Sequence, residues 1–141
     1  MDTLPQAFEE RIRAGERFVL QLLEGPVFHF DSTLRGRLPD EQGLYRIFEL
    51  DGDPVKTLRA GRTKRAARGL RQRVYQNHFM GEQDGNIRRQ LVRSGRCRDT
   101  QAAKDFLRER CGVQVLMIAD EEERKWAEHF MLAILRPEES D

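Results

Sequence analysis

The sequence is poor in the features that mark several classes of protein. Its two cysteines, Cys97 and Cys111, form no CxxC motif and no cluster with histidine, so a structural zinc site is not expected. No apolar run approaches the roughly 18 residues that a membrane span needs. The first residues show no basic region leading into an apolar stretch, as a signal peptide would. We therefore expect a cytoplasmic protein with two reduced thiols and no contact with a membrane.

The sequence also has little net charge, with a formal value of only +1. Along the chain, however, the two signs separate. Residues 59–98 hold twelve lysines and arginines against two acids, a net charge of +10, whereas residues 120–141 hold eight acids against three bases, a net charge of −5. Such polarity is typical of chains that contact a polyanion, and arginine matches phosphate oxygens bidentately. Charge alone leaves a second interpretation open, in which the arginines pair with the acidic stretch.

The pattern of apolar residues predicts one α+β domain with a single modest core. Periodicity and capping signals predict helices over residues 5–24, 66–79, 87–92, 100–110 and 121–135. Alternation and turn residues predict strands over residues 44–48, 55–61 and 113–118, the first two as a hairpin. We expect a small, mostly antiparallel three-stranded sheet flanked by helices in residues 39–141, with a helical N-terminal extension in residues 1–38.

Two polar residues in the predicted hairpin and the following helix are candidates for chemistry. Tyr45 shares a strand face with Gly43, and a phenol there could accept or relay a proton if cations favoured its ionised form. Arg73 lies three residues after Leu70 and four before Asn77, so in an α-helix all three share one side. Each residue also has an ordinary interpretation, as a strand tyrosine or as a surface arginine paired with a carboxylate.

Glu128 is a third candidate, because its half of the last predicted helix is apolar nearly all round. Met131, Leu132 and Leu135 follow it at helical spacing. A carboxylate among such neighbours needs a partner. That partner is either Arg124, one turn back along the helix, or a metal ion.

Together these features resemble a known family. Gly43-Leu44-Tyr45 on one strand and Arg59-Ala60-Gly61 on the next resemble the paired triplets that name the GIY-YIG nuclease superfamily. A helix with Arg73 follows, and then a late helix in which Glu128 stands nine residues before Pro137, like the family glutamate. Within the superfamily the arrangement is similar to the catalytic domain of bacterial excision-repair nucleases and to homing endonucleases.

The resemblance covers about residues 39–137 and implies a metal-dependent endonuclease that hydrolyses phosphodiester bonds in nucleic acid, with DNA as the expected substrate. It implies that Glu128 holds a single Mg²⁺ or Mn²⁺, that Arg73 steadies the scissile phosphate and that Tyr45 is the general base. The further residues expected to contact nucleic acid are Arg62, Lys64, Arg71, Asn77, Arg88 and Arg89.

The sequence departs from the family pattern at three positions. Arg59 replaces the tyrosine that usually begins the second triplet, and we expect this added cation to support catalysis. Asn77 takes the slot where the family often carries histidine or tyrosine. His78, one residue later, would lie about 140° further round an ideal helix than Arg73 and could serve only if the helix end were distorted. Glu138 stands where an asparagine usually follows the proline. The alternative is therefore a module of the same fold that binds nucleic acid but cuts weakly or not at all.

Overall fold

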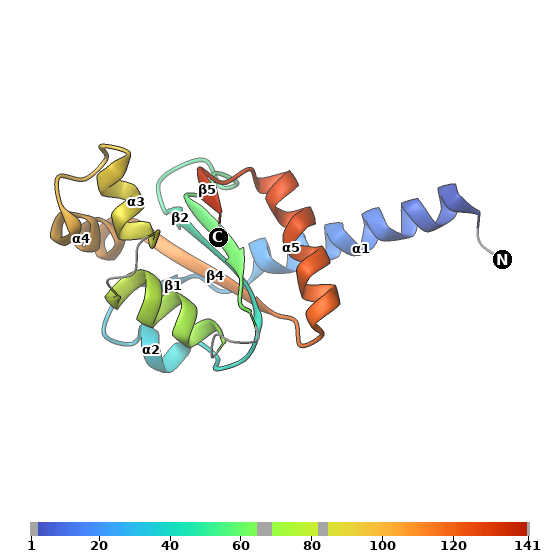
Figure 1. Cartoon of the computed structure of the whole chain (residues 1–141), viewed down its shortest axis with the longest axis horizontal. Coiled ribbons are helices and arrows are strands. Elements are labelled where there is room, and N and C mark those ends of the chain that lie inside the picture. The colour runs from blue at the N-terminus through green and yellow to red at the C-terminus, as the bar shows by residue number, and fades with distance from the viewer. Residues whose placement is uncertain (1–2, 65–68, 82–84, 141) are drawn as a thin grey trace.

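The structure is a computed structural model of the chain and describes residues 3–64, 69–81 and 85–140. Its elements are α1 (Leu4–Glu24), β1 (Phe28–His29), α2 (Leu34–Arg37), β2 (Gly43–Glu49), β3 (Arg59–Arg62), η1 (Arg71–Met80), α3 (Ile87–Arg93), α4 (Thr100–Arg110), β4 (Cys111–Met117), α5 (Glu121–Leu135) and β5 (Glu139–Ser140). The strands form one sheet in the order β1-β4-β2-β3-β5, antiparallel throughout except for the parallel pair of β3 and β5 (Figure 1).

The α+β class is confirmed, but the expectation of a three-stranded sheet is wrong in strand number. The three central strands are the predicted ones, and β2 and β3 form the predicted hairpin, with Tyr45 opposite Gly61. The two additional strands, β1 and β5, have two residues each and lie at the two edges of the sheet. A two-residue strand is too short to show the alternation from which strands are predicted.

β3 is also shorter than the strand expected over residues 55–61. Its first residue is Arg59, and Val55 is 53% exposed in the preceding loop. The backbone N–H of Val55 donates to a side-chain oxygen of Asp53, and that of Lys56 donates to the Asp53 carbonyl. A turn therefore satisfies these groups instead of a neighbouring strand.

Helices cover both faces of the sheet and divide the core in two (Figure 1). On one face, η1, α2, α3 and α4 enclose a core that includes Tyr45, Ile47 and Val113. On the other face, α1 and α5 pack on Leu44 and Ala60. Successive strand residues point to opposite faces, so Tyr45 and Leu44 belong to different cores, as the alternation predicted.

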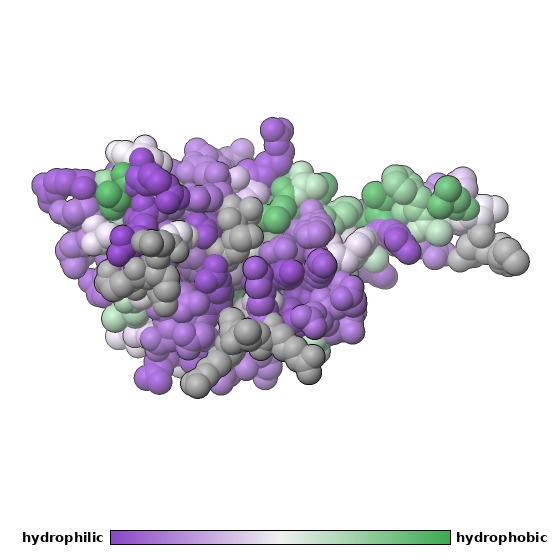
Figure 2. All heavy atoms as spheres, viewed as in Figure 1, coloured by the Kyte–Doolittle hydropathy of each residue, from purple (hydrophilic) through white to green (hydrophobic). Residues whose placement is uncertain are grey.

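The first 38 residues, expected as a helical extension, contribute to both cores. Val19 and Leu22 of α1 pack into the core beneath α5, and Phe30 and Leu34 join the other core. The outer half of α1 projects beyond the domain and carries an apolar strip at the surface (Figures 1 and 2). The exposed apolar side chains of this strip are Leu4, Phe8 and Ile12. Within the described ranges, no helix has the length and the apolar composition that crossing a membrane requires.

The segment expected as an α-helix over residues 66–79 is a π-helix, η1, so the expected helix type is wrong; residues 66–68 lie outside the described ranges. In a π-helix each backbone hydrogen bond spans five residues rather than four, so residues five apart are neighbours on one side. Val74, His78 and Phe79 of η1 are all buried. Periodicity does not distinguish the two helix types over ten residues, whereas tertiary packing does.

Gly69 determines where this helix begins. Its φ of +94° lies in the left-handed region, and a Cβ atom there would lie 2.8 Å from the carbonyl oxygen of Glu41. The close approach allows the backbone N–H of Leu70 to donate to that same oxygen and the N–H of Arg71 to donate to the Pro39 carbonyl. Only glycine combines this backbone conformation with this contact.

Candidate functional site

A hydrogen bond between Tyr45 of β2 and His78 of η1 lies at the centre of the candidate site. The Tyr45 Oη and the His78 Nε2 are 2.7 Å apart, and both residues are fully buried. In an α-helix His78 would point well away from the side that carries Arg73. In the π-helix, His78 is five residues after Arg73 and therefore next to it one turn on. The π-helical geometry of η1 is therefore the helix distortion that brings His78 into the site.

The second ring nitrogen of His78 determines which way this hydrogen bond runs. Nδ1 accepts the backbone N–H of Ile87 at 3.1 Å and therefore carries no proton. Burial first, and then the charges of Arg73 and Arg59, hold the pKa of His78 well below its ordinary value of 6.5. A neutral ring with a bare Nδ1 carries its proton on Nε2, so His78 donates and the Tyr45 oxygen accepts.

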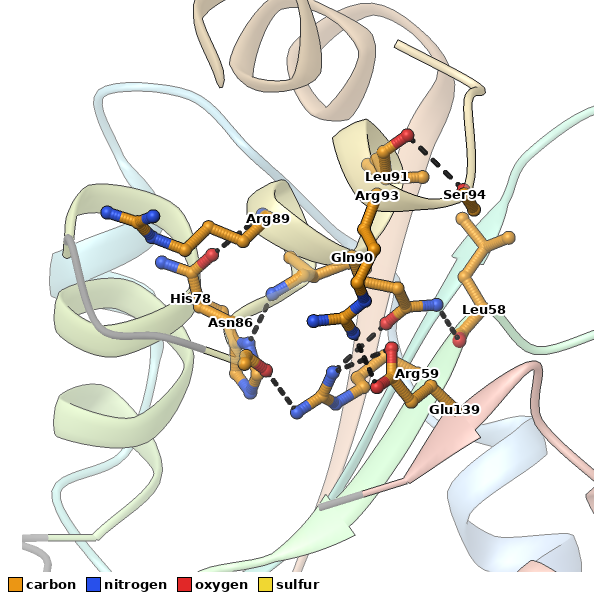
Figure 3. Close-up of polar contacts among 12 residues, drawn as sticks. Leu58, Arg59, His78, Asn86, Arg89, Gln90, Leu91, Arg93, Ser94 and Glu139 are labelled. Atoms are coloured by element: carbon orange, nitrogen blue, oxygen red, sulfur yellow. Dashed lines mark hydrogen bonds and ion pairs between the residues drawn. The ribbon is translucent and has the colours of Figure 1, made fainter. Parts of the chain in front are cut away.

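Asn86 holds Ile87 in place for this contact. The Asn86 side chain caps α3 by accepting the backbone N–H of Arg89 at 3.0 Å (Figure 3). Its amide nitrogen donates to the carbonyls of Asn77 at 3.2 Å and Gly81 at 2.9 Å, which ties the start of α3 to the end of η1. The sequence analysis did not identify Asn86 and Ile87 as part of the site. A signal existed, because the first N–H groups of a predicted helix need acceptors outside the helix.

Arg59 lies on the same sheet face as Tyr45, because it pairs with Ile47, two residues along β2 from Tyr45. Its guanidinium donates to the Gln90 side chain at 3.0 Å and to the Gly85 carbonyl at 2.5 Å (Figure 3). It also lies 3.5 Å from a carboxylate oxygen of Glu139. Burial lowers the pKa of Arg59 to about 10, which still leaves it a cation at neutral pH. Gln90, which fixes the guanidinium, was not predicted.

Arg73 completes a group of four candidates on this face. It is half-buried, and burial lowers its pKa. Its charge lowers the pKa of both His78 and Arg59. The structure thus brings together Tyr45, His78, Arg59 and Arg73.

Glu128, the remaining candidate, approaches the sheet from the opposite face. It lies on α5, is 5% exposed and has a carboxylate oxygen 3.5 Å from the guanidinium of Arg62. Of the two partners that the sequence left open for Glu128, Arg124 is ruled out, because its guanidinium donates to backbone carbonyls instead. The three carbonyls belong to Thr63, Ile118 and Ala119, at 3.0–3.1 Å.

Glu128 offers one carboxylate to a divalent ion. Within the described ranges, no three His, Cys, Asp or Glu side chains gather into a metal-binding group. Magnesium keeps several waters and is commonly held by one or two carboxylates together with phosphate oxygens of a substrate. The donor set therefore fits an ion that binds together with a phosphate rather than one held in a cage of protein ligands.

Three of the residues expected to contact nucleic acid make contacts within the fold. Arg71 donates from Nε and Nη2 to the Leu38 carbonyl, at 3.2 and 3.0 Å. Arg88 is 5% exposed and donates to the His78 carbonyl at 3.4 Å. The Asn77 side chain accepts a hydrogen bond from Gln72 at 3.2 Å. Each of the three side chains therefore has a structural role within the fold.

The other basic residues differ in how far solvent reaches them. Lys64 is exposed, Arg89 is half-buried, and Arg62 is half-buried beside Glu128. Part of the basic stretch also pairs with the acidic one, as the second interpretation of the charges proposed. The pairs join Arg93 and Arg59 to Glu139 at 2.8 and 3.5 Å, and Arg96 to Glu138 at 3.5 Å.

Comparisons of the chain with protein-family models, with curated proteins and with solved structures found no match. The chemistry must therefore be inferred from the residues themselves. A buried phenol that accepts a hydrogen bond from a neutral imidazole, beside two guanidinium groups, is suited to stabilise negative charge. That charge can lie on the phenol oxygen or on a bound anion.

Proposed function

We propose that the chain is a metal-dependent endonuclease that hydrolyses phosphodiester bonds in DNA, with Tyr45 as the general base. The supporting observation is the 2.7 Å hydrogen bond from His78 to the Tyr45 oxygen, in the tautomer fixed by Ile87. A phenol is a useful base only as its phenolate. Burial of Tyr45 disfavours that form, and the donated N–H and the charges of Arg73 and Arg59 offset this cost.

In the proposed reaction, a water molecule attacks the phosphorus and gives its proton to the Tyr45 phenolate. Arg73, with Arg59 beside it, would neutralise the charge that develops on the phosphate oxygens. His78 would not take up a proton, because its Nδ1 is engaged with Ile87 and its pKa is far below neutrality. It acts as a positioning residue that holds the phenol oxygen in place.

Glu128 would hold the divalent ion, Mg²⁺ or Mn²⁺. When bound, such an ion stabilises charge on the leaving oxygen. The separation of 3.5 Å between Arg62 and Glu128 is long for a charge-assisted hydrogen bond, which is usually about 2.7–2.9 Å. An arriving phosphate would compete with Glu128 for the Arg62 guanidinium and so free the carboxylate.

A second candidate function is a nucleic-acid-binding module of the same fold that cuts weakly or not at all. Two observations favour it: Tyr45 has no exposed surface, and Glu128 is paired on the opposite sheet face. A hydrolase needs water to reach Tyr45, whereas a binding module does not.

Incubation with supercoiled plasmid and with branched DNA, in the presence of Mg²⁺ or Mn²⁺, separates the two candidates. We expect the parent protein and Glu122→Gln to cut, and Glu128→Gln to leave the DNA intact. Glu122 is the matched control, because it is an exposed acid on the same helix. A parent protein that binds both DNAs but cuts neither would establish the second candidate. Cleavage by Glu128→Gln at the parent rate would refute the metal assignment.

A further inference from the structure

An acidic segment lies along the outer edge of β3. Residues Glu139 and Ser140 pair in parallel with Arg59 and Ala60 as strand β5. The backbone N–H groups of Glu138 and Glu139 donate to the carbonyls of Thr57 and Leu58, at 3.0 and 3.2 Å. The segment thus covers the outer edge of β3, the strand that carries Arg59 (Figure 1).

The carboxylate of Glu139 lies between two guanidinium groups. One oxygen is 2.8 Å from Arg93 and the other is 3.5 Å from Arg59 (Figure 3). The Arg59 side chain is only 5% exposed and is anchored by Gln90 and Gly85, whereas Arg93 and Glu139 are 60% and 35% exposed. A buried, anchored cation and a solvent-accessible one therefore form a built site for an anion.

A phosphate group fits the same donors. Two guanidinium groups bind phosphate oxygens in the geometry with which they bind a carboxylate, and a phosphodiester brings a full negative charge. A groove of about 300 Å³ adjoins the site and is lined by Gly85, Arg89, Val92, Arg93 and Thr100. Arg93 belongs to both the groove and the Glu139 pair, so a polyphosphate chain could continue from one into the other.

The segment is attached in a way that allows it to leave. β5 has only two residues, and the turn before it contains Arg136, whose φ of 46° makes it the one non-glycine residue with positive φ in the described ranges. Pro137 follows and has no backbone N–H to donate. A short edge strand after a strained turn is held mainly by its ion pairs and a few backbone hydrogen bonds.

We propose that Glu138–Ser140 is an acidic strap that covers a phosphate-binding site made by Arg59 and Arg93, and that a nucleic-acid backbone displaces it. The choice of nucleic acid rests on the proposed function. The phosphate site itself rests on the two guanidinium groups and their carboxylate. The strap lowers affinity, because only the fraction of molecules with the strap released can bind.

The test compares the parent protein with Glu139→Gln, which keeps the size of the side chain and removes its charge. Binding of a fluorescent DNA duplex is followed by anisotropy over a range of salt concentrations. We expect Glu139→Gln to bind about tenfold more tightly, with a slope of log affinity against log salt steeper by about one to two, one for each additional phosphate that the protein neutralises. Glu109→Gln, an exposed acid on α4, is the matched control and should change affinity less than about twofold.

A double-mutant cycle with Arg93→Ala tests whether the two residues act together. In the parent background Arg93 is masked by Glu139, so Arg93→Ala should change DNA affinity little. In the Glu139→Gln background the same substitution should remove most of the increase in affinity. Equal effects of Arg93→Ala in both backgrounds would overturn the strap. Thermal unfolding of each variant establishes that it is folded.

Inorganic tripolyphosphate separates a failure of the strap from a failure of the proposed function. It should raise the melting temperature of Glu139→Gln more than that of the parent protein. If no variant binds DNA but tripolyphosphate shows this difference, the phosphate site and strap stand and the nucleic-acid function fails. If the parent protein binds DNA and Glu139→Gln binds no better, the strap is wrong and the proposed function is untouched. If neither probe distinguishes the variants, the strap is wrong.

Discussion

Buried charged and polar groups have different kinds of partner on the two faces of the sheet. On the face covered by α1 and α5, the guanidinium groups of Arg124 and Arg46 donate to acceptors supplied by the fold, chiefly backbone carbonyls and the Gln114 side chain. On the face covered by η1 and α3, Tyr45 and His78 form a hydrogen-bonded pair, and the charges of Arg73 and Arg59 act on His78. The first arrangement is structural. The second contains side chains that could gain or lose a proton during a reaction.

The two faces meet at β3. Arg59 and Arg62 are three residues apart on this strand, so their side chains point to opposite faces. Arg59 joins the face of Tyr45, and Arg62 pairs with Glu128 on the other face. An anion bound at β3 could therefore contact residues of both groups.

Arg73→Ala should give the largest effect on the Tyr45 face. Removing a group that stabilises transition-state charge commonly lowers turnover by about 10²–10³-fold. Lys64→Ala, which removes an exposed cation, should weaken DNA binding and reduce the salt slope by roughly one while sparing turnover. Single-turnover cleavage and salt titration of both variants measure this. Equal losses of turnover would mean that Arg73 only adds to the general positive field.

His78→Phe should reduce the free energy of unfolding by about 2–4 kcal/mol, because it leaves the Ile87 N–H and the Tyr45 oxygen without their partner. It should also change the pH dependence of stability. Below about pH 6.5 the unfolded chain protonates this imidazole while the folded chain does not, so the parent protein loses stability as the pH falls.

That loss can reach about 1.4 kcal/mol per pH unit until the folded pKa is reached. The variant lacks this contribution, so its stability should change less between about pH 7 and pH 5. Urea unfolding of both proteins at several pH values provides the comparison. Parallel curves would show that folding leaves the pKa of His78 unchanged, contrary to the lowered pKa.

Glu128→Gln should have the smallest effect on stability. Its ion pair with Arg62 is long at 3.5 Å, and glutamine keeps a side-chain oxygen that can accept from the same guanidinium, so we expect a loss of about 1–2 kcal/mol. On the same helix, Arg124→Ala should reduce stability by about 2–4 kcal/mol, because several buried carbonyls lose their donor. Thermal unfolding of the two variants compares them. A larger loss for Glu128→Gln would make Glu128 a structural residue.

The sequence predicted the elements whose signals are local. The periodicity of α1, the Asp120 cap of α5 and the alternation of β2 place these elements within a residue or two of their observed bounds. The edge strands β1 and β5 were missed because their two residues pair with partners distant in sequence. Val55 was wrongly included in β3 because a β-branched residue favours a strand. In the structure its backbone N–H instead donates to the Asp53 side chain in a turn.

For the candidate site, the sequence predicted residues better than it predicted partners. Tyr45 and Arg59 were both chosen from the sequence, and the observed register of β2 and β3 puts them on one sheet face. The contact of His78 with Tyr45 depends on the π-helix, which no local signal specified. Spacing along the helix offered Arg124 as one possible partner of Glu128, whereas the fold supplies Arg62 from strand β3. Sequence spacing describes neighbours on one element and says little about neighbours on the next.

The central claim is that Tyr45 acts as a base in phosphodiester cleavage. The most direct test is the single-turnover rate of Tyr45→Phe with Mg²⁺ on a DNA that the parent protein cuts, with DNA affinity measured alongside. Tyr75→Phe is the matched control, because Tyr75 lies on η1 and is only partly buried against the same core. We predict that Tyr45→Phe cuts at least about 10²-fold more slowly than the parent, with unchanged affinity, and that Tyr75→Phe cuts normally. A Tyr45→Phe variant that cuts at the parent rate would contradict the claim.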